Sequence, residues 1–258
     1  MAAKGGPVFD RGRREEMATA FQAGGEHYDR VRPGYPAESL DWLVEGTAAP
    51  VHDALDVGAG TGKFTEQLVA RGWEVAALDP SADMLAQLSR NLPDVHTLLG
   101  PAETIGLASG SMDLVTVAQA WHWLDAMAAS TEIARVLRPG GRLGLIWNQL
   151  DVSIPWVHRL ARIMHAGDVH KPDFRPVVGP EFVNLESHET RWAQDITPED
   201  LLELVKSRSY YLKASETIRV KVLGNLTWYL YEHLGHHAGE TLRLPYFTQT
   251  WRARTQGG

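Results

Sequence analysis

The chain has 258 residues, of which 44% are hydrophobic, and its formal net charge is −7. It contains no cysteine, which excludes disulfides and thiolate chemistry. No apolar run approaches the roughly 20 residues that a membrane span requires. The acidic balance and the absence of a basic tract disfavour nucleic acid and anionic membrane as partners. These properties predict one cytoplasmic domain that works as a monomer or homodimer.

The N-terminal part of the chain alternates flexible and rigid stretches. Residues 1–12 are rich in glycine and charge and are expected to lack order, whereas 13–22 and 38–44 have helical patterns. Between these two helices, residues 24–36 combine glycines with two prolines that force the preceding residues into extended backbone. Loops with several rigid and aromatic residues are often binding elements. We therefore expect residues 24–36 to cover a ligand, although simple packing on a sheet is the alternative.

A strand, a glycine turn and a helix follow. Residues 53–57 have the length and composition of a buried parallel strand, Gly58, Gly60 and Gly62 come next, and 64–71 are expected to be helical. Glycine leaves backbone bare for a ligand and permits positive φ. The spacing G-x-G-x-G is not the dinucleotide fingerprint G-x-G-x-x-G. A P-loop is excluded because it needs glycine at position 57 and Ser or Thr at position 64.

The alternation of strand and helix continues to residue 147. Asp79 ends the second strand, 19 residues after Gly60, where a carboxylate can accept both hydroxyls of a ribose. Ser81 is the expected N-cap of the next helix. The predicted strands are 74–78, 95–99, 111–118 and 142–147, the helices are 82–91 and 125–137, and 138–141 form a turn.

The last third departs from this alternation. Residues 155–180 are expected to form part of a cap. The other predicted elements are a strand at 185–192, a helix from 198 to about 211, a helix from about 215 to 234 and a strand at 241–254.

Three motifs resemble the class I S-adenosylmethionine-dependent methyltransferases, in particular the small-molecule branch called type 11. They are Asp-Val-Gly-Ala-Gly-Thr-Gly at 56–62, Leu-Arg-Pro-Gly-Gly at 137–141, and the Tyr28…Arg32-Pro-x-Tyr35-Pro segment. The resemblance implies a Rossmann-like α/β fold whose seven-stranded, mostly parallel sheet has the order 3-2-1-4-5-7-6. Within one domain spanning 1–258, it implies lid helices at 1–45, a cofactor-binding core at 50–150, a cap with the sixth strand at 151–240 and the last strand at 241–254.

The resemblance also implies where S-adenosylmethionine would bind, beyond the carboxyl ends of the strands. Tyr28 is expected to face the sulfonium by cation–π attraction and Arg32 to hold the cofactor's carboxylate. Met84 would cover the adenine, and the Ala102-Glu103 pair would read its polar edge. The complete set expected at the cofactor is Tyr28, Arg32, Asp56, Gly58, Ala59, Gly60, Thr61, Gly62, Asp79, Pro80, Met84, Ala102, Glu103, Ala118, Gln119 and Ala120.

His122 and Tyr28 are the candidate catalytic residues. An imidazole titrates in the range of a general base, with Asp125 as a candidate orienting group. The alternative is that His122 only shapes the pocket. The acceptor is expected to be an aromatic or heteroaromatic metabolite, with a small carboxylic acid clamped by Arg208 as the alternative. The expected acceptor-binding residues are Trp123, Trp147, Asn148, Trp156, Arg208 and Tyr210.

Other classes of function fit less well. A nicotinamide oxidoreductase is disfavoured by the glycine spacing and by the lack of a Tyr-x-x-x-Lys pair after the fourth strand. A nucleic-acid amino-methyltransferase would need an Asn/Asp-Pro-Pro-Tyr-like motif where this chain has Gln-Ala-Trp-His-Trp. A non-catalytic cofactor-binding module is compatible with the same glycine motif. No metal site is predicted, because the clustered histidines are not joined by a carboxylate in a known motif.

Overall fold

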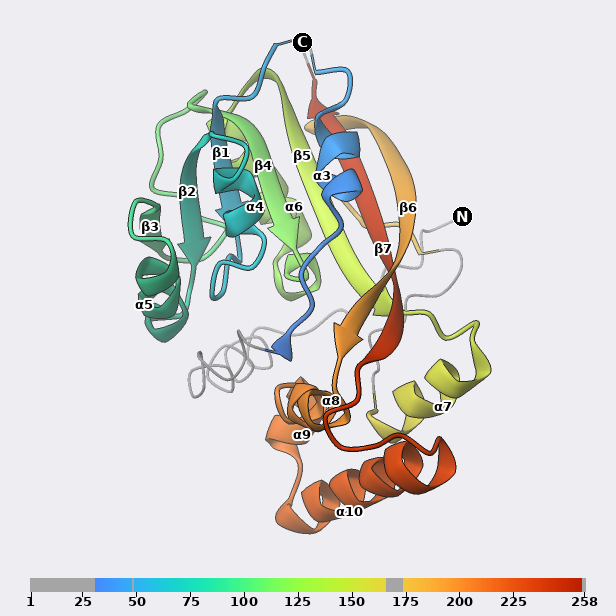
Figure 1. Cartoon of the computed structure of the whole chain (residues 1–258). Helices are drawn as coiled ribbons and strands as arrows, with labels where there is room; N and C mark the ends of the chain where they lie inside the picture. Colours follow the sequence, from blue (N-terminus) through green and yellow to red (C-terminus); the bar gives the residue numbers. More distant parts are fainter. Residues whose placement is uncertain (1–30, 48, 166–173, 257–258) are drawn as a thin grey trace.

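The computed structural model describes residues 31–47, 49–165 and 174–256. It contains a seven-stranded sheet of order β3-β2-β1-β4-β5-β7-β6 (Figure 1). The first five strands are parallel, and β7 runs antiparallel to both of its neighbours, which confirms the predicted fold class and strand order. The strands are β1 (Asp53–Val57), β2 (Glu74–Asp79), β3 (His96–Leu99), β4 (Met112–Ala118), β5 (Leu137–Leu150), β6 (Phe182–Ile196) and β7 (Leu242–Thr255).

Helices cover both faces of the sheet, and strand periodicity decides which face each side chain joins. In β4, Leu114 packs in the cluster under α3 (Ala37–Val44), α4 (Thr65–Val69) and α5 (Ala82–Asn91). Its neighbour Val115 packs in the opposite cluster, with Ile133 of α6 (Ala126–Val136). The central strands are therefore buried on both sides of the sheet, as their continuous apolar runs predict.

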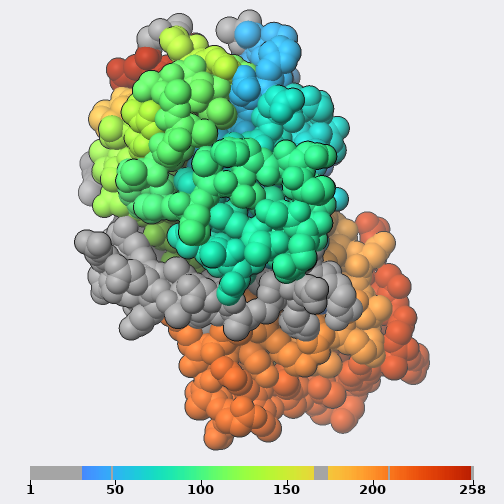
Figure 2. Space-filling view, turned by 90° about the vertical axis from the view of Figure 1, so that its left-hand side faces the viewer, coloured from blue at the N-terminus to red at the C-terminus, as the bar shows by residue number. Residues whose placement is uncertain are grey.

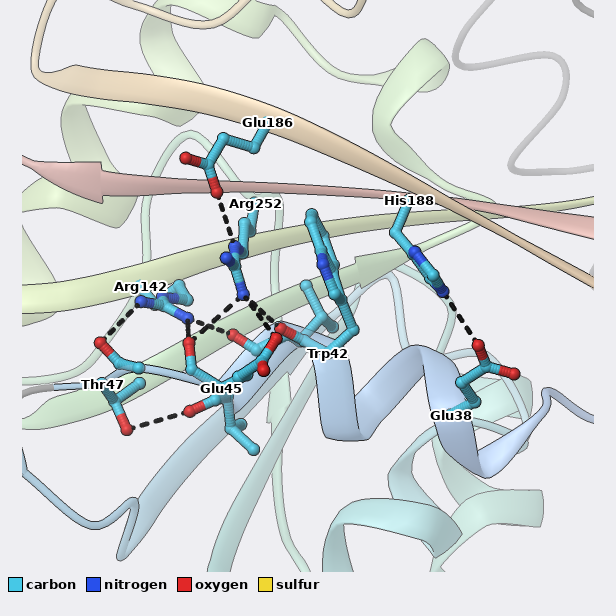
Figure 3. A network of polar contacts seen from close by, with 11 residues as sticks. Glu38, Trp42, Glu45, Thr47, Arg142, Glu186, His188 and Arg252 are labelled. Atoms are coloured by element: carbon cyan, nitrogen blue, oxygen red, sulfur yellow. Dashed lines mark hydrogen bonds and ion pairs between the residues drawn. The ribbon is translucent and has the colours of Figure 1, made fainter.

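Helix α3 is fixed to the sheet by arginines from the strands (Figure 3). Arg252 of β7 lies 4.2 Å from the centre of the Trp42 ring and donates to the Trp42 carbonyl at 2.6 Å. Arg142 of β5 donates to the carbonyls of Leu43 and Glu45, both at 2.7 Å. These bonds satisfy carbonyls at the helix C-terminus, so they cap α3 as well as anchor it.

A second layer of helices lies beyond the carboxyl ends of the parallel strands (Figure 1). We call it the cap: α7 (Pro155–Ile163), α8 (Pro198–Lys206), α9 (Ser209–Lys213), α10 (Glu216–Thr227) and the π-helical turn η2 (Trp228–His233). Its core includes the fully buried Leu160, Leu204 and Leu226, and it extends onto the ends of β5, β6 and β7. Figure 2 shows α8 to α10, in orange, as a layer distinct from the green and cyan core.

Several boundaries differ from the predicted ones. The helix expected from 198 to about 211 is interrupted at Arg208, whose extended backbone separates α8 from α9. The helix expected from about 215 to 234 is α-helical to Thr227 and then widens to a π-helix. The turn expected at 138–141 lies inside β5, where Gly140 has a φ of +78° and the pairing with β4 shifts register. Strand β6, expected at 185–192, continues to Ile196, which packs in the cap, whereas β7 matches its expected bounds to within one residue.

Some expectations fall outside the described residues: the helix at 13–22, Tyr28, and the cap segment at 166–173. Within the described ranges, no helix is long and apolar enough to cross a membrane. The same ranges hold no group of three or more His, Cys, Asp or Glu side chains that could bind a metal ion.

Candidate functional site

The glycine turn after β1 is tied to the end of β2. The backbone N–H groups of Gly58 and Ala59 both donate to the Leu78 carbonyl, at 2.8 and 3.1 Å. All three glycines have positive φ: +69° at Gly58, +56° at Gly60 and +95° at Gly62. The sequence therefore needs glycine here for conformation, because other residues rarely adopt these angles.

The glycines differ in what surrounds them. A Cβ at Gly58 would lie 2.4 Å from the Cβ of Ala120, and one at Gly62 would lie 3.0 Å from Leu88 of α5. Among the described residues, no atom lies within 4 Å of a Cβ placed at Gly60. Gly58 and Gly62 are thus required by packing, whereas Gly60 faces open space that a ligand can fill.

Asp79 at the end of β2 lies directly beside this open space. Its carboxylate accepts from the backbone N–H of Gly60 at 2.9 Å and from that of Ser81 at 2.8 Å. Burial raises the pKa of Asp79, and the two amide hydrogen bonds offset part of that rise. The carboxylate is only 8% exposed. It lies at the carboxyl ends of β1, β2, β4 and β5, which we call the rim, in the position predicted for a ribose-binding group.

Asp56 lies beneath the turn and is 1% exposed. Its two oxygens accept from the hydroxyls of Thr65, at 2.7 Å, and Thr116, at 3.0 Å. Burial raises the pKa of Asp56 to about 7, and the negative charge of Asp79 adds to the rise. The two threonines hold this carboxyl in place, and no spacing in the sequence pointed to them.

The adenine-side candidates divide between the rim and the start of α6. Met84 and Ala102 are buried, whereas Pro80 is exposed. Glu103 accepts from the backbone N–H of Asp125 at 2.8 Å, so its carboxylate positions the first residue before α6. Adenine recognition by Glu103 therefore stays a prediction, and its present partner is protein backbone.

A chain of hydrogen bonds connects the ends of β4 and β5 with the N-terminal segment. Gln119, which follows β4 with a φ of +58°, donates to the Asn148 carbonyl at 2.9 Å. The Asn148 side chain donates to the Gly34 carbonyl at 2.7 Å and accepts from Thr248 at 2.6 Å. Asn148 thus holds the backbone of residues 31–36 against the rim, a role that the sequence reasoning had not assigned to it.

His122 meets Trp147 across the ends of β4 and β5. The indole N–H of Trp147 lies 3.3 Å from Nδ1 of His122. An indole nitrogen can only donate, so Nδ1 must accept, and a neutral His122 then carries its proton on Nε2. Asp125 accepts from the backbone N–H groups of Met127 and Ala128 and caps α6. This tautomer makes Nε2 a donor, which favours a pocket-shaping role over a general base.

The six predicted acceptor residues fall into two groups. Trp123, Trp147 and Asn148 lie at the rim, where Trp123 is 4.6 Å from the His122 ring and Trp147 is 5.3 Å from Phe174. Trp156, Arg208 and Tyr210 lie in the cap: Trp156 packs against its core, and Tyr210 stacks on His165 at 4.1 Å. The structure also brings Arg32 to this side, since its guanidinium donates to the Ser207 carbonyl at 2.8 Å.

The residues at the rim fit S-adenosylmethionine. Gly60 leaves room for close approach, Asp79 presents a buried carboxylate for hydroxyl groups, and the aromatic residues of the β4 and β5 ends lie on the same rim. Because aromatic rings attract cations, this site suits the positively charged sulfonium of the cofactor.

Comparisons with known proteins agree with this geometry. Residues 55–145 match the family model described as a methyltransferase domain. An uncharacterised methyltransferase of Mycobacterium tuberculosis is 44% identical over 241 residues, which cover 93% of this chain and 97% of the relative. A malonyl-[acyl-carrier protein] O-methyltransferase of Methylococcus capsulatus is 36% identical over 146 residues, 54% of this chain and 53% of the relative.

A solved methyltransferase structure resembles most of this fold. It is a type II methyltransferase candidate from Anaeromyxobacter dehalogenans, with a TM-score of 0.63 and 26% identity, covering 86% of this chain and 96% of that one. The extent of the match to the mycobacterial relative reaches beyond the domain core into the cap. The chain belongs to the class I S-adenosylmethionine-dependent methyltransferases.

Proposed function

We propose that the protein methylates a small aromatic or heteroaromatic molecule bound between the rim and the cap. The observation that carries this proposal is the aromatic group at the ends of β4 and β5. The rings of His122, Trp123 and Phe174 are partly exposed there, and the buried Trp147 supports two of them. Partly exposed aromatic side chains offer stacking surface to a flat acceptor.

S-adenosylmethionine would supply a methyl group on a positively charged sulfur. The chain's own residues would hold the cofactor through the Gly58–Gly62 turn and Asp79 and align the acceptor for in-line displacement. An oxygen or nitrogen atom of the acceptor would take that methyl group, and the acceptor's proton would leave to solvent. His122, with its proton on Nε2, would donate a hydrogen bond that orients the acceptor.

A second candidate is methylation of a carboxylate. Burial raises the pKa of Tyr246 in β7, and the positive charges of Arg208 and Arg32 offset part of that rise. Both guanidiniums therefore lie near one phenol, and two arginines close together suit a carboxylate. The acceptor named for the Methylococcus relative also carries a carboxyl group. In this reading Arg32 serves the acceptor instead of the cofactor.

The test is transfer of a labelled methyl group from S-adenosylmethionine to pools of phenols, aromatic amines and small organic acids. The proposal predicts labelled products among the aromatic compounds that withstand mild alkali. Products that release labelled methanol in mild alkali are methyl esters and would assign the second candidate. Trp123→Ala should then impair the aromatic reaction more than Arg208→Ala does, and the opposite ranking would contradict the proposal.

A further inference from the structure

A surface groove lies in the cap, apart from the glycine turn and Asp79. It has a volume of about 660 Å³ and is lined by α7, α10 and Tyr210 of α9. Small-molecule sites commonly have volumes of about 300–1,000 Å³. No residue of the predicted cofactor set lines it. We call it the cap groove.

The cap groove concentrates positive charge in an acidic protein. Arg159 and Arg162 of α7 and Lys221 of α10 line it, and no carboxylate is among its lining residues. Neither Arg162 nor Lys221 forms an ion pair within the described part of the chain. Because the chain as a whole carries −7, this local surplus of cations favours an anion.

One of the three cations is already held in position. The Arg159 guanidinium lies 5.5 Å from the ring centre of Trp228 and 5.1 Å from that of Tyr229, and one of its nitrogens is 3.3 Å from Nε2 of His233. A side chain ordered in advance loses less conformational entropy when a ligand binds. The π-helical turn η2 supplies all three of these neighbours.

The groove also exposes apolar surface. Ile218 of α10 is 39% exposed and Tyr210 is 38% exposed. Tyr210 keeps one face on His165 at a ring distance of 4.1 Å, so its position is fixed by stacking. Exposed apolar side chains next to unpaired cations match a ligand with an anionic end and an apolar body.

We propose that the cap groove is a second ligand site, which binds a small organic oxyanion. Its phosphate or carboxylate lies between Arg162 and Lys221, with the side-chain amide of Asn225 as a further donor, and its ring or short chain lies against Tyr210 and Ile218. The groove includes Tyr210 of the predicted acceptor set, but it shares no residue with the glycine turn, and its test measures binding alone.

The experiment is calorimetric titration of the full chain with four probes at fixed ionic strength: phenyl phosphate, benzoate, benzyl alcohol and inorganic phosphate. We expect a low-millimolar dissociation constant for phenyl phosphate or benzoate, with the tighter of the two naming the anion. Benzyl alcohol lacks the charge and inorganic phosphate lacks the ring, so each should bind more weakly, the alcohol by about tenfold or more.

Charge reversal locates the site. Arg162→Glu combined with Lys221→Glu should weaken the tighter anion by about tenfold or more. Arg162→Gln is the milder second variant if that pair fails to fold, as judged by thermal melting. Arg243→Glu is the matched control: this arginine of β7 is 77% exposed, does not line the groove, and its loss should leave the affinity within about twofold.

Three results would overturn the proposal. Equal affinity for benzyl alcohol would remove the role of the anion. Equal losses in Arg162→Glu/Lys221→Glu and Arg243→Glu would reduce the effect to overall charge. If no probe binds but an acidic helical peptide binds in an Arg162- and Lys221-dependent manner, the groove is a protein-docking surface and the proposal of a small-molecule site is wrong.

Discussion

The rim and the cap are built by different means. At the rim, backbone groups do most of the positioning: Gly58 and Ala59 bond to Leu78, and Gly60 bonds to Asp79. In the cap, apolar side chains such as Leu204 and Leu226 decide how the helices meet. Backbone geometry demands particular residues at particular spacings, whereas a core accepts many apolar combinations of similar volume. The rim is therefore the part of the molecule whose local geometry can be predicted from the sequence.

The largest expected effect comes from filling the space at Gly60. Gly60→Val should abolish cofactor binding, because a Cβ there points into open space that the ligand is proposed to occupy. The fold should survive, with a stability loss of about 1–3 kcal/mol from a branched residue at positive φ. Calorimetry with S-adenosylhomocysteine and thermal melting check both statements. Normal binding by a folded variant would make the Gly60 turn purely structural.

A substitution in the cap should have the opposite effect: it should lower stability and leave cofactor binding nearly unchanged. Leu226→Ala removes a fully buried side chain of α10 and should cost about 2–5 kcal/mol of unfolding free energy. Cofactor affinity of the folded protein should stay within about threefold, because the rim is held by its own backbone bonds. Denaturant titration and calorimetry measure the two quantities. A tenfold loss of cofactor affinity would show that rim and cap are energetically coupled.

The pH dependence of stability should reveal Asp56. Its folded pKa of about 7 lies above its ordinary value, so protonation favours the folded state. The stabilisation is complete below pH ~4, falls as pH rises towards 7, and is lost above it, a span of at most about 4 kcal/mol. Asp56→Asn, read by melting from pH 4 to 8 in the absence of cofactor, should flatten this slope and melt higher than the parent at pH 8. An unchanged slope would contradict a buried, neutral Asp56.

His122 is expected to produce the smallest effect. His122→Ala should lower turnover by less than about tenfold without moving the pH profile, because its Nδ1 faces the Trp147 indole and its Nε2 is a donor. Trp147→Phe removes that indole N–H and serves as the partner variant. A drop of about 10²–10⁴-fold in His122→Ala, with cofactor affinity retained, would instead establish a general base.

The fold was largely predictable, and the residues show why. The strand order was predicted from the family resemblance. The glycine turn and the place of Asp79 at the end of β2 were predicted from the residues, because parallel strands and glycine turns leave strong local patterns. The break at Arg208 and the π-turn at Trp228 were not, since helix propensity alone favours continuation there.

The site was predictable where one element supplies it and less so where several converge. Thr65 and Thr116 reach Asp56 from different elements, and Asn148 reaches Gly34 over a separation of 114 residues. Arg32 and Arg208, assigned separately to cofactor and acceptor, both lie near Tyr246. Such meetings depend on the packing of the cap against the sheet, which no local pattern encodes.

The most direct test of the central claim is calorimetric titration of S-adenosylmethionine into the parent protein, Asp79→Ala and Asp83→Ala. Asp79 lies at the rim beside Gly60, whereas Asp83 is an exposed carboxylate in the first turn of α5. The account predicts that Asp79→Ala weakens binding by about 2–3 kcal/mol, or about 30- to 150-fold, while Asp83→Ala does not. Equal affinity in all three folded proteins would contradict the assignment of the cofactor to this rim.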